Sequence, residues 1–145
     1  MMTAIADGDY QITQYFGENP AAYARFGLAG HNGLDLALPA GTPLLAVEDA
    51  SLVEAAYDAT GYGYYAKLQT PRGSHWLYAH MSEPCPLEIG QAVSAGDPIG
   101  VSGSSGNSTG PHLHLGFRPD GSYRGGGYGG YVDPLPYLIG QERAV

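Results

Sequence analysis

Residues 64–80 read Tyr-Tyr-Ala-Lys-Leu-Gln-Thr-Pro-Arg-Gly-Ser-His-Trp-Leu-Tyr-Ala-His, and this stretch decides the fold class. Its two halves, 64–69 and 74–80, are rich in the aromatic and aliphatic side chains that favour strands. Thr70-Pro-Arg-Gly73 between them has the composition of a turn. The stretch therefore predicts a β-hairpin.

The rest of the chain has the same character, with short apolar segments separated by turns. Its 23 glycines and 11 prolines are common turn residues, and no apolar pattern with the helical period extends beyond one or two turns. We expect an all-β fold, an antiparallel, barrel-sandwich-like sheet structure with little helix. The expected elements are a strand at 11–16, a helical turn within 18–26, a strand at 34–38, a hairpin of 43–48 with 51–57, and strands at 92–93, 98–101 and 112–117.

Length and charge restrict the function classes. The 145 residues fit a single domain over 1–145. The net charge is −8 and no basic cluster occurs, whereas nucleic-acid binding needs a basic surface. No apolar run has the length of a membrane span, and the N-terminus lacks the basic and apolar regions of a signal peptide. We therefore expect no nucleic-acid partner, no membrane insertion and no signal peptide in this chain. Cys85, the single cysteine, excludes an internal disulfide and is expected to be structural.

Four of the five histidines fall into three short strings: His31-Asn-Gly-Leu-Asp35, Tyr78-Ala-His80-Met-Ser82 and Pro111-His112-Leu-His114. In a strand, residues i, i+2 and i+4 lie on one face. His31 and Asp35 are therefore predicted to point the same way, and the two histidines of the third string likewise. Three imidazole or carboxylate donors are enough to hold zinc and leave one tetrahedral position for water. The sequence thus predicts a hydrolytic zinc site with two histidines left for proton transfer.

The motifs resemble those of the lysostaphin/LytM-type zinc endopeptidases, which cut peptide bonds in bacterial peptidoglycan. The similarity runs in family order over about 11–118, outside the Tyr/Gly-rich segment 123–131 and the C-terminal segment 132–145. Its strings are His31-Asn-Gly-Leu-Asp35-Leu-Ala, Gly41-Thr-Pro, Gly61-Tyr-Gly63, Leu77-Tyr-Ala-His80-Met-Ser82, Gly90-Gln-x-Val-x-x-Gly96-Asp-Pro-Ile-Gly100 and Ser102-Gly-x-x-Gly-Asn-Ser-Thr-Gly-Pro-His112-Leu-His114.

The resemblance implies a role for each motif residue. It makes His31, Asp35 and His114 the ligands of a Zn²⁺ cofactor, and His80 and His112 the catalytic pair beside a groove that admits an extended peptide. No glutamate adjoins the histidines, so a histidine must be the general base. We favour His112 as the base, with His80 polarising the carbonyl or donating to the intermediate, although these two roles are interchangeable at this level.

Other residues near the motifs have open roles. Some family members carry a transition-state tyrosine before the first zinc histidine. Tyr23 and Arg25 are the candidates for this position here, and a plain loop role is the alternative for both. Asn107 is expected to shape the loop beside the site. His75 is expected at a surface or edge, facing away from His80. Trp76 is expected in the core, with a place along the groove as the alternative. The segment 123–131 is either a flexible loop or a lip over the substrate.

The resemblance implies an enzyme acting at the bacterial cell wall, in a bacterial or a phage setting, on a peptidoglycan peptide. The motifs leave the cleaved bond and the oligomeric state open. A non-catalytic binding or scaffold domain with the same fold is the main alternative. A swinging-arm carrier domain would need a lysine at a hairpin tip, whereas Lys67 is expected inside a strand.

Overall fold

The computed structural model describes residues 5–7, 10–122 and 124–138 and is built mostly from antiparallel strands. Seven strands form one sheet in the order β1-β2-β9-β6-β5-β4-β7, and β3 pairs with β8 in a second sheet. The strands are β1 (Gln11–Gln14), β2 (Leu34–Ala37), β3 (Pro43–Leu45), β4 (Ala50–Asp58), β5 (Gly63–Gln69), β6 (His75–Met81), β7 (Ala92–Val93), β8 (Pro98–Val101) and β9 (His112–Arg118). The all-β prediction is confirmed.

Helical structure in the described residues is confined to three short pieces, α1 (Pro20–Tyr23), η1 (Ala24–Phe26) and η2 (Leu135–Tyr137). The first two account for the helical turn expected within 18–26. None of the helices in these ranges has the length and apolar character needed to cross a membrane.

The hairpin of residues 64–80 is present as β5 and β6. Leu68 lies opposite Trp76 in its register, and the turn is closed by hydrogen bonds between the backbones of Thr70 and Ser74 (2.9 Å) and of Gly73 and Thr70 (2.9 Å). Lys67 lies within β5, opposite Leu77, as expected. The strongest local pattern in the sequence therefore forms the centre of the large sheet.

The predicted hairpin of 43–48 with 51–57 is wrong. Strand β3 pairs with β8 instead, and β4 pairs with β5 and β7. The backbone between β3 and β4 finds its partners elsewhere, because Ala46 N–H bonds to the Asp97 carbonyl (2.9 Å) and Val47 N–H to the Tyr78 hydroxyl (3.2 Å). A distant strand and a buried side chain thus take the hydrogen bonds that the predicted hairpin would have used.

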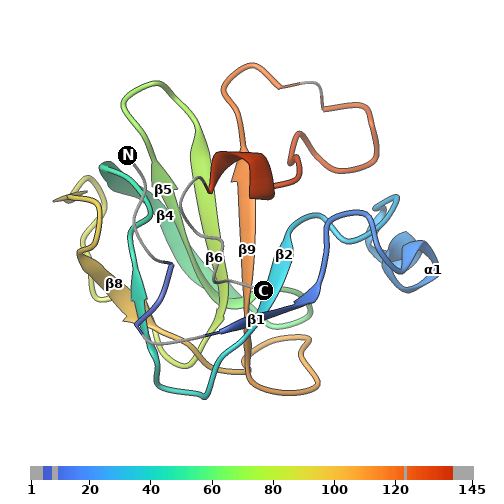
Figure 1. The fold of residues 1–145 in the computed structure, drawn as a ribbon, viewed down its shortest axis with the longest axis horizontal. Coiled ribbons are helices and arrows are strands. Elements are labelled where there is room, and N and C mark those ends of the chain that lie inside the picture. Colours follow the sequence, from blue (N-terminus) through green and yellow to red (C-terminus); the bar gives the residue numbers. More distant parts are fainter. Residues whose placement is uncertain (1–4, 8–9, 123, 139–145) are drawn as a thin grey trace.

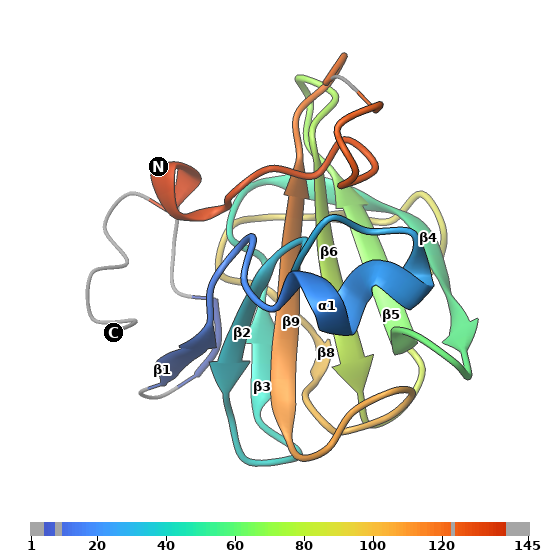
Figure 2. The same ribbon diagram turned by 90° about the vertical axis from the view of Figure 1, so that its right-hand side faces the viewer.

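The core lies between the two sheets. Alternate residues of β2, β6 and β9 point into it, among them Leu36, Tyr78 and Leu115, and Leu44 of β3 and Ile99 of β8 cover them. Figures 1 and 2 show β8 on one side of the large sheet and α1 on the other. The side occupied by α1 is therefore free to carry polar residues.

Trp76 is almost fully buried in this core, as predicted. Its ring packs 4.4 Å from that of Phe117 between centroids, and its indole N–H donates to Glu48 (2.7 Å). The same Glu48 carboxylate accepts two hydrogen bonds from Arg72, each 2.8 Å. The polar atom of the tryptophan is therefore satisfied although its body is buried.

His75 and His80 were expected on opposite faces, and this prediction is wrong. The β5–β6 register shifts so that three steps along β6, from Tyr78 to Met81, match two along β5. His80 within this bulge has a φ of 61°. A bulge adds one residue and turns the following side chains, so the His80 ring lies 4.6 Å from that of His112. His75 was expected at a surface or edge; it is partly exposed, but β6 lies between β5 and β9 and is not an edge strand.

The Tyr/Gly-rich segment is described from 124 onward; Tyr123 and residues 139–145 of the C-terminal segment lie outside the described residues. Gly127 accepts a hydrogen bond from Ala29 N–H (2.8 Å), and the Tyr128 ring packs on Phe16 (4.5 Å between centroids). This segment therefore contacts the loop that leads to His31.

Cys85 is half-buried, its thiol donates to the Ile99 carbonyl (3.2 Å), and burial raises its pKa.

Candidate metal centre and active site

A cleft of about 450 Å³ opens on the face of the large sheet that points away from the core. Side chains of α1, η1 and the following residues form one wall, and the turn before β5 and residues 107–109 form the other. Figure 2 shows α1 in front of the sheet on this side. The predicted residues that line the cleft are Tyr23, Arg25, Asp35, His80, Asn107, His112 and His114.

Three side chains converge beside this cleft. Asp35 of β2 and His114 of β9 are direct partners across the two strands, and both are buried together with His31. His31 Nε2 lies 3.0 Å from Asp35 Oδ1 and 3.1 Å from His114 Nδ1, and the last two atoms are 3.1 Å apart. The structure therefore brings together the three residues predicted as zinc ligands.

His31 reaches this position differently from the prediction. It lies in the loop before β2 rather than on the strand with Asp35. Its backbone is fixed by two hydrogen bonds, from His31 N–H to the Glu18 carbonyl (2.9 Å) and from Gly17 N–H to the His31 carbonyl (2.7 Å). The assumption of a shared strand face was wrong, although the two side chains do meet.

The hydrogen bonds around the ligand trio fix which nitrogens are free. The Tyr15 carbonyl can only accept a hydrogen bond, so His31 Nδ1 is the donor in this contact (3.1 Å). The other ring nitrogen, His31 Nε2, therefore keeps its lone pair. His114 turns Nδ1 toward Asp35, and its Nε2 is buried with no partner in the described part of the chain. A methyl group on Gly33 would stand 2.9 Å from that Nε2. The missing side chain of Gly33 is therefore what lets the His114 ring fit here.

These donors fit a zinc ion. Zinc binds imidazole nitrogen and carboxylate oxygen at about 2.0–2.2 Å in a tetrahedron, which places ligand atoms roughly 3.3 Å apart. Burial acts to raise the pKa of Asp35, but the close contacts with the His114 and His31 rings outweigh it and hold that pKa well below its usual range. A charged carboxylate and two imidazole nitrogens thus converge on one point.

His80 and His112 form a second pair, with their ring centroids 4.6 Å apart. His80 Nδ1 donates to the Ser105 carbonyl (2.7 Å), and His112 Nδ1 donates to the Gly110 carbonyl (2.9 Å). Each neutral ring therefore keeps Nε2 as its basic nitrogen. His112 Nε2 lies 3.6 Å from Asp35 Oδ2, beside the ligand trio. The pair therefore places a basic nitrogen of His112, with the His80 ring packed against it, next to the candidate metal position.

Burial lowers the pKa of His80 to about 4, and the neighbouring His112 and His114 act in the same direction. The bond to Ser105 opposes this shift without cancelling it. His80 is therefore neutral at pH 7.

The lowered pKa of His80 predicts acid sensitivity. An unfolded chain binds a proton at this histidine below about pH 6.5, whereas the folded protein does not until about pH 4. The stability should therefore fall by roughly 3 kcal/mol as the pH drops through this window. We expect urea unfolding in chelator to show a smaller fall between pH 7 and pH 4 for His80→Gln than for the wild type. An equal fall in the free energy of unfolding of the two proteins would contradict a lowered pKa for His80.

The loop that holds His80 depends on close packing against Gly63. Ser105 donates its hydroxyl to the Met81 carbonyl and accepts Tyr64 N–H (3.0 Å). Gly63 has a φ of 63°, and a Cβ there would lie 2.4 Å from the Ser105 backbone. The site thus needs glycine for both its conformation and its contact.

Gly63→Ala is expected to destabilise the fold by about 2 kcal/mol more than Gly121→Ala, because steric overlap adds to backbone strain. Gly121 is a matched control, since its φ is 71° but no atom lies within 4 Å of the added Cβ. Urea unfolding measures both. Equal losses would mean that the Ser105 contact relaxes freely.

Three residues whose roles were left open, Tyr23, Arg25 and Asn107, line the cleft. Tyr23 packs its ring 5.3 Å from that of His31, and its hydroxyl donates to Gln14 (3.1 Å). The guanidinium of Arg25 stacks over Phe26, with Cζ 4.7 Å from the ring centroid. Asn107 fixes the opposite wall, because its N–H donates to the Gly61 carbonyl (2.9 Å).

Two site residues were not assigned from the sequence. Tyr62 stacks on His114, with 5.6 Å between ring centroids, and its hydroxyl accepts a hydrogen bond from Asn32 (3.1 Å). The Tyr62 carbonyl also accepts His80 N–H (2.7 Å). Tyr62 belongs to the string Gly61-Tyr-Gly63, and Asn32 follows His31. Both residues therefore lie in strings that resemble the family motifs, but the motifs alone did not indicate what they do.

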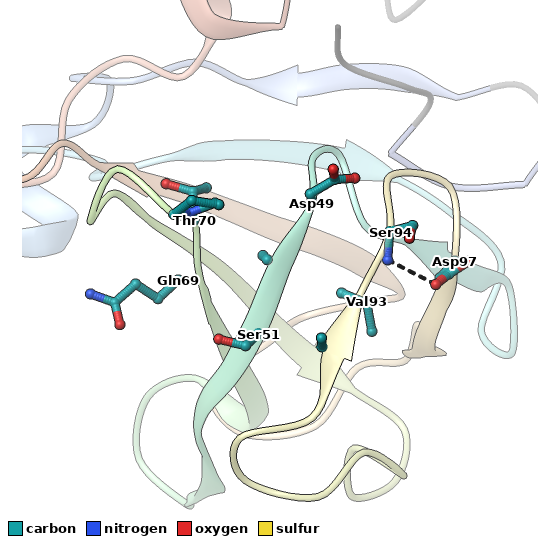
Figure 3. A pocket seen from close by; sticks show the side chains of 10 residues that line it. Asp49, Ser51, Gln69, Thr70, Val93, Ser94 and Asp97 are labelled. Carbon is teal, nitrogen blue, oxygen red and sulfur yellow. Dashed lines mark hydrogen bonds between the residues drawn. The ribbon is translucent and has the colours of Figure 1, made fainter.

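A second hollow, of about 460 Å³, lies where β4, β5 and β7 meet (Figure 3). Its two carboxylates hold turns: Asp97 accepts Ser94 N–H (2.8 Å), and Asp49 accepts Ala95 N–H (2.9 Å). None of the five predicted site residues lines it. This hollow is therefore separate from the candidate active site.

Comparison with known proteins agrees with the geometry. Glycyl-glycine endopeptidase ALE-1 of Staphylococcus capitis is 38% identical over 110 residues, 74% of this chain and 29% of that protein. An uncharacterized metalloprotease of Haemophilus influenzae is 40% identical over 91 residues, 63% of this chain and 19% of that protein. The chain thus spans less than a third of these relatives.

The same likeness extends to solved structures and to a family. The catalytic domain of the antimicrobial peptidase lysostaphin from Staphylococcus simulans superposes with a TM-score of 0.75 and 31% identity, covering 89% of this chain and 92% of that one. The family description of peptidase family M23 matches residues 29–130, which include the ligand trio and the His80–His112 pair. The family expected from the motifs is confirmed, and the chain belongs to peptidase family M23.

Proposed function

We propose that this chain is a zinc-dependent endopeptidase that hydrolyses peptide bonds in bacterial peptidoglycan. The observation that carries the proposal is the convergence of His31, Asp35 and His114 within 3.1 Å of one another, next to the His80–His112 pair in an open cleft. The lysostaphin-like fold and the family membership support the same reaction class.

The ligand trio would hold the metal through His31 Nε2, Asp35 Oδ1 and His114 Nδ1. When bound, zinc lowers the pKa of a coordinated water to about 7 and polarises a carbonyl oxygen. The chain's own contribution is to hold these atoms rigidly. The Tyr15 carbonyl orients His31, and the Tyr62 ring packs on His114, as supporting contacts do in other metal sites.

His112 is the general base in this proposal. Its Nε2 faces Asp35 and takes a proton from the attacking water, whose oxygen bonds to the scissile carbonyl carbon. The same nitrogen then gives that proton to the leaving amine as the carbon–nitrogen bond breaks. One proton thus passes from the water through His112 to the leaving amine, and no other group is needed to carry it.

His80 acts as an acceptor rather than a donor. Its Nδ1 proton is used by the Ser105 carbonyl, so donation would require a second proton on Nε2, and the pKa of about 4 opposes this. Neutral His80 therefore orients the attacking water by accepting a hydrogen bond at Nε2. This replaces the two roles considered from the sequence, in which His80 polarises the carbonyl or donates to the intermediate.

The proposal places the reaction at the bacterial cell wall, in a bacterial or a phage setting. A non-catalytic scaffold with this fold is the alternative, and it would not need an intact His80–His112 pair. The swinging-arm carrier alternative loses its support, because Lys67 lies inside β5.

Mass spectrometry of fragments released from purified sacculi tests the proposal. We expect the zinc-loaded protein to create new peptide ends, and chelator or His112→Ala to prevent them. The fragment masses identify the bond. Absence of release across several cross-link chemistries would favour the scaffold alternative.

A further inference from the structure

One arginine, Arg25, lines the cleft of this protein, whose net charge is −8. Six lysines and arginines oppose fourteen aspartates and glutamates. Two of the cations are paired with carboxylates, Arg72 with Glu48 (2.8 Å) and Lys67 with Glu54 (3.8 Å). Arg25 lines the cleft and forms no ion pair within the described ranges.

The setting of Arg25 orients its guanidinium. The residue is exposed in η1, between α1 and the loop that carries His31. Its Cζ lies over the Phe26 ring, 4.7 Å from the centroid. Stacking of this kind fixes the plane of the guanidinium and leaves its N–H groups free for a planar anion.

The carboxylates that share the cleft already have partners. Asp35 bonds to His31 and His114, and Asp58 accepts the backbone N–H of Tyr62 (3.1 Å). Neither forms an ion pair with Arg25. The cleft therefore presents a free, oriented cation close to the candidate catalytic residues.

We infer that Arg25 binds a free carboxylate of the substrate, so that the cleft selects acidic stem peptides of peptidoglycan over neutral glycine bridges. This inference rests on the proposed function. Stem peptides carry carboxylates on their glutamyl and diamino-acid residues, and arginine binds a carboxylate through two parallel hydrogen bonds. A glycine bridge offers only amide groups, which make weaker bonds to a guanidinium.

Two soluble cross-linked stem-peptide dimers test the inference, identical except that their side carboxyls are free in one and amidated in the other. Pentaglycine amide, which has no carboxylate, is a third substrate. We expect the wild type to hydrolyse the free dimer with a kcat/KM at least tenfold higher than the amidated dimer, mainly through KM. Charge-assisted hydrogen bonds of about 1.5–3 kcal/mol correspond to this range.

Arg25→Gln should lower the ratio of the two kcat/KM values toward one, and Arg25→Lys should restore part of it. Arg72→Gln is the charge-matched control, because it removes a cation outside the cleft lining and should leave the ratio unchanged. An equal loss on both dimers, carried by kcat, would overturn the inference and give Arg25 a role in the transition state. A preference for pentaglycine amide would also overturn it.

The inference and the proposed function fail in different ways. If the wild type cleaves none of the three substrates, the proposed function fails, and calorimetric binding of the two dimers then decides the inference. Tighter binding of the free dimer that is lost in Arg25→Gln would uphold carboxylate recognition. Equal binding of both dimers would overturn it.

Discussion

Asp35→Asn is expected to lose stoichiometric zinc and all measurable hydrolysis together. Asp35 is the only carboxylate in the trio, and Oδ1 lies within 3.1 Å of both imidazole nitrogens. Asparagine keeps the size of the side chain but removes the charge. Because supporting residues alone change metal affinity by 10–100-fold, loss of a ligand should cost at least about a hundredfold.

Metal content after dialysis and the thermal shift on adding zinc measure this effect. A ligand that binds only the folded state raises its stability, so zinc should raise the Tm of the wild type and not that of Asp35→Asn. His114→Ala should behave in the same way, but it also leaves a cavity beside Tyr62. The isosteric variant therefore separates metal loss from packing loss.

Asp58→Asn is the matched control for metal content. Asp58 is a second carboxylate at the cleft, but it holds Tyr62 N–H and is not part of the trio. It should bind zinc like the wild type. If Asp35→Asn retained one zinc at unchanged affinity, the metal would have to lie elsewhere.

The pattern of residues 112–114 was sufficient to predict part of the site. Alternation along β9 places His112 and His114 on one face, and the β2–β9 register sets His114 against Asp35. Both strands are regular, so local periodicity carried the prediction. The strand composition and turn residues of 64–80 likewise predicted the β5–β6 hairpin.

The sequence could not show how His31 and His80 reach the site. His31 is positioned by backbone bonds to Gly17 and Glu18, in a loop that has no period. His80 is turned by a bulge, which depends on the register between two strands and not on either one alone. The failed hairpin of 43–48 has the same cause, since β3 pairs with a strand more than fifty residues away.

His112→Ala is expected to bind zinc normally and to lose turnover by about 10²–10⁴-fold, the usual contribution of a general base. Its Nε2 lies 3.6 Å from Asp35 Oδ2, close to the trio but outside the 3.1 Å triangle of ligand atoms. The loss should therefore appear in kcat with zinc content unchanged. Loss of turnover with normal zinc content distinguishes His112 from the proposed ligands, because loss of a ligand should remove both zinc and turnover.

His75→Ala is the matched control for this variant. His75 lies on β6 like His80, but it pairs with Gln69 and Arg118 and does not line the cleft. It should hydrolyse sacculi at the wild-type rate. Wild-type turnover in His112→Ala, together with a large loss in His80→Ala, would make His80 the general base. The proton would then be accepted by His80 Nε2, because His80 Nδ1 donates to the Ser105 carbonyl. Wild-type turnover in both variants would exclude the histidine pair from the chemistry.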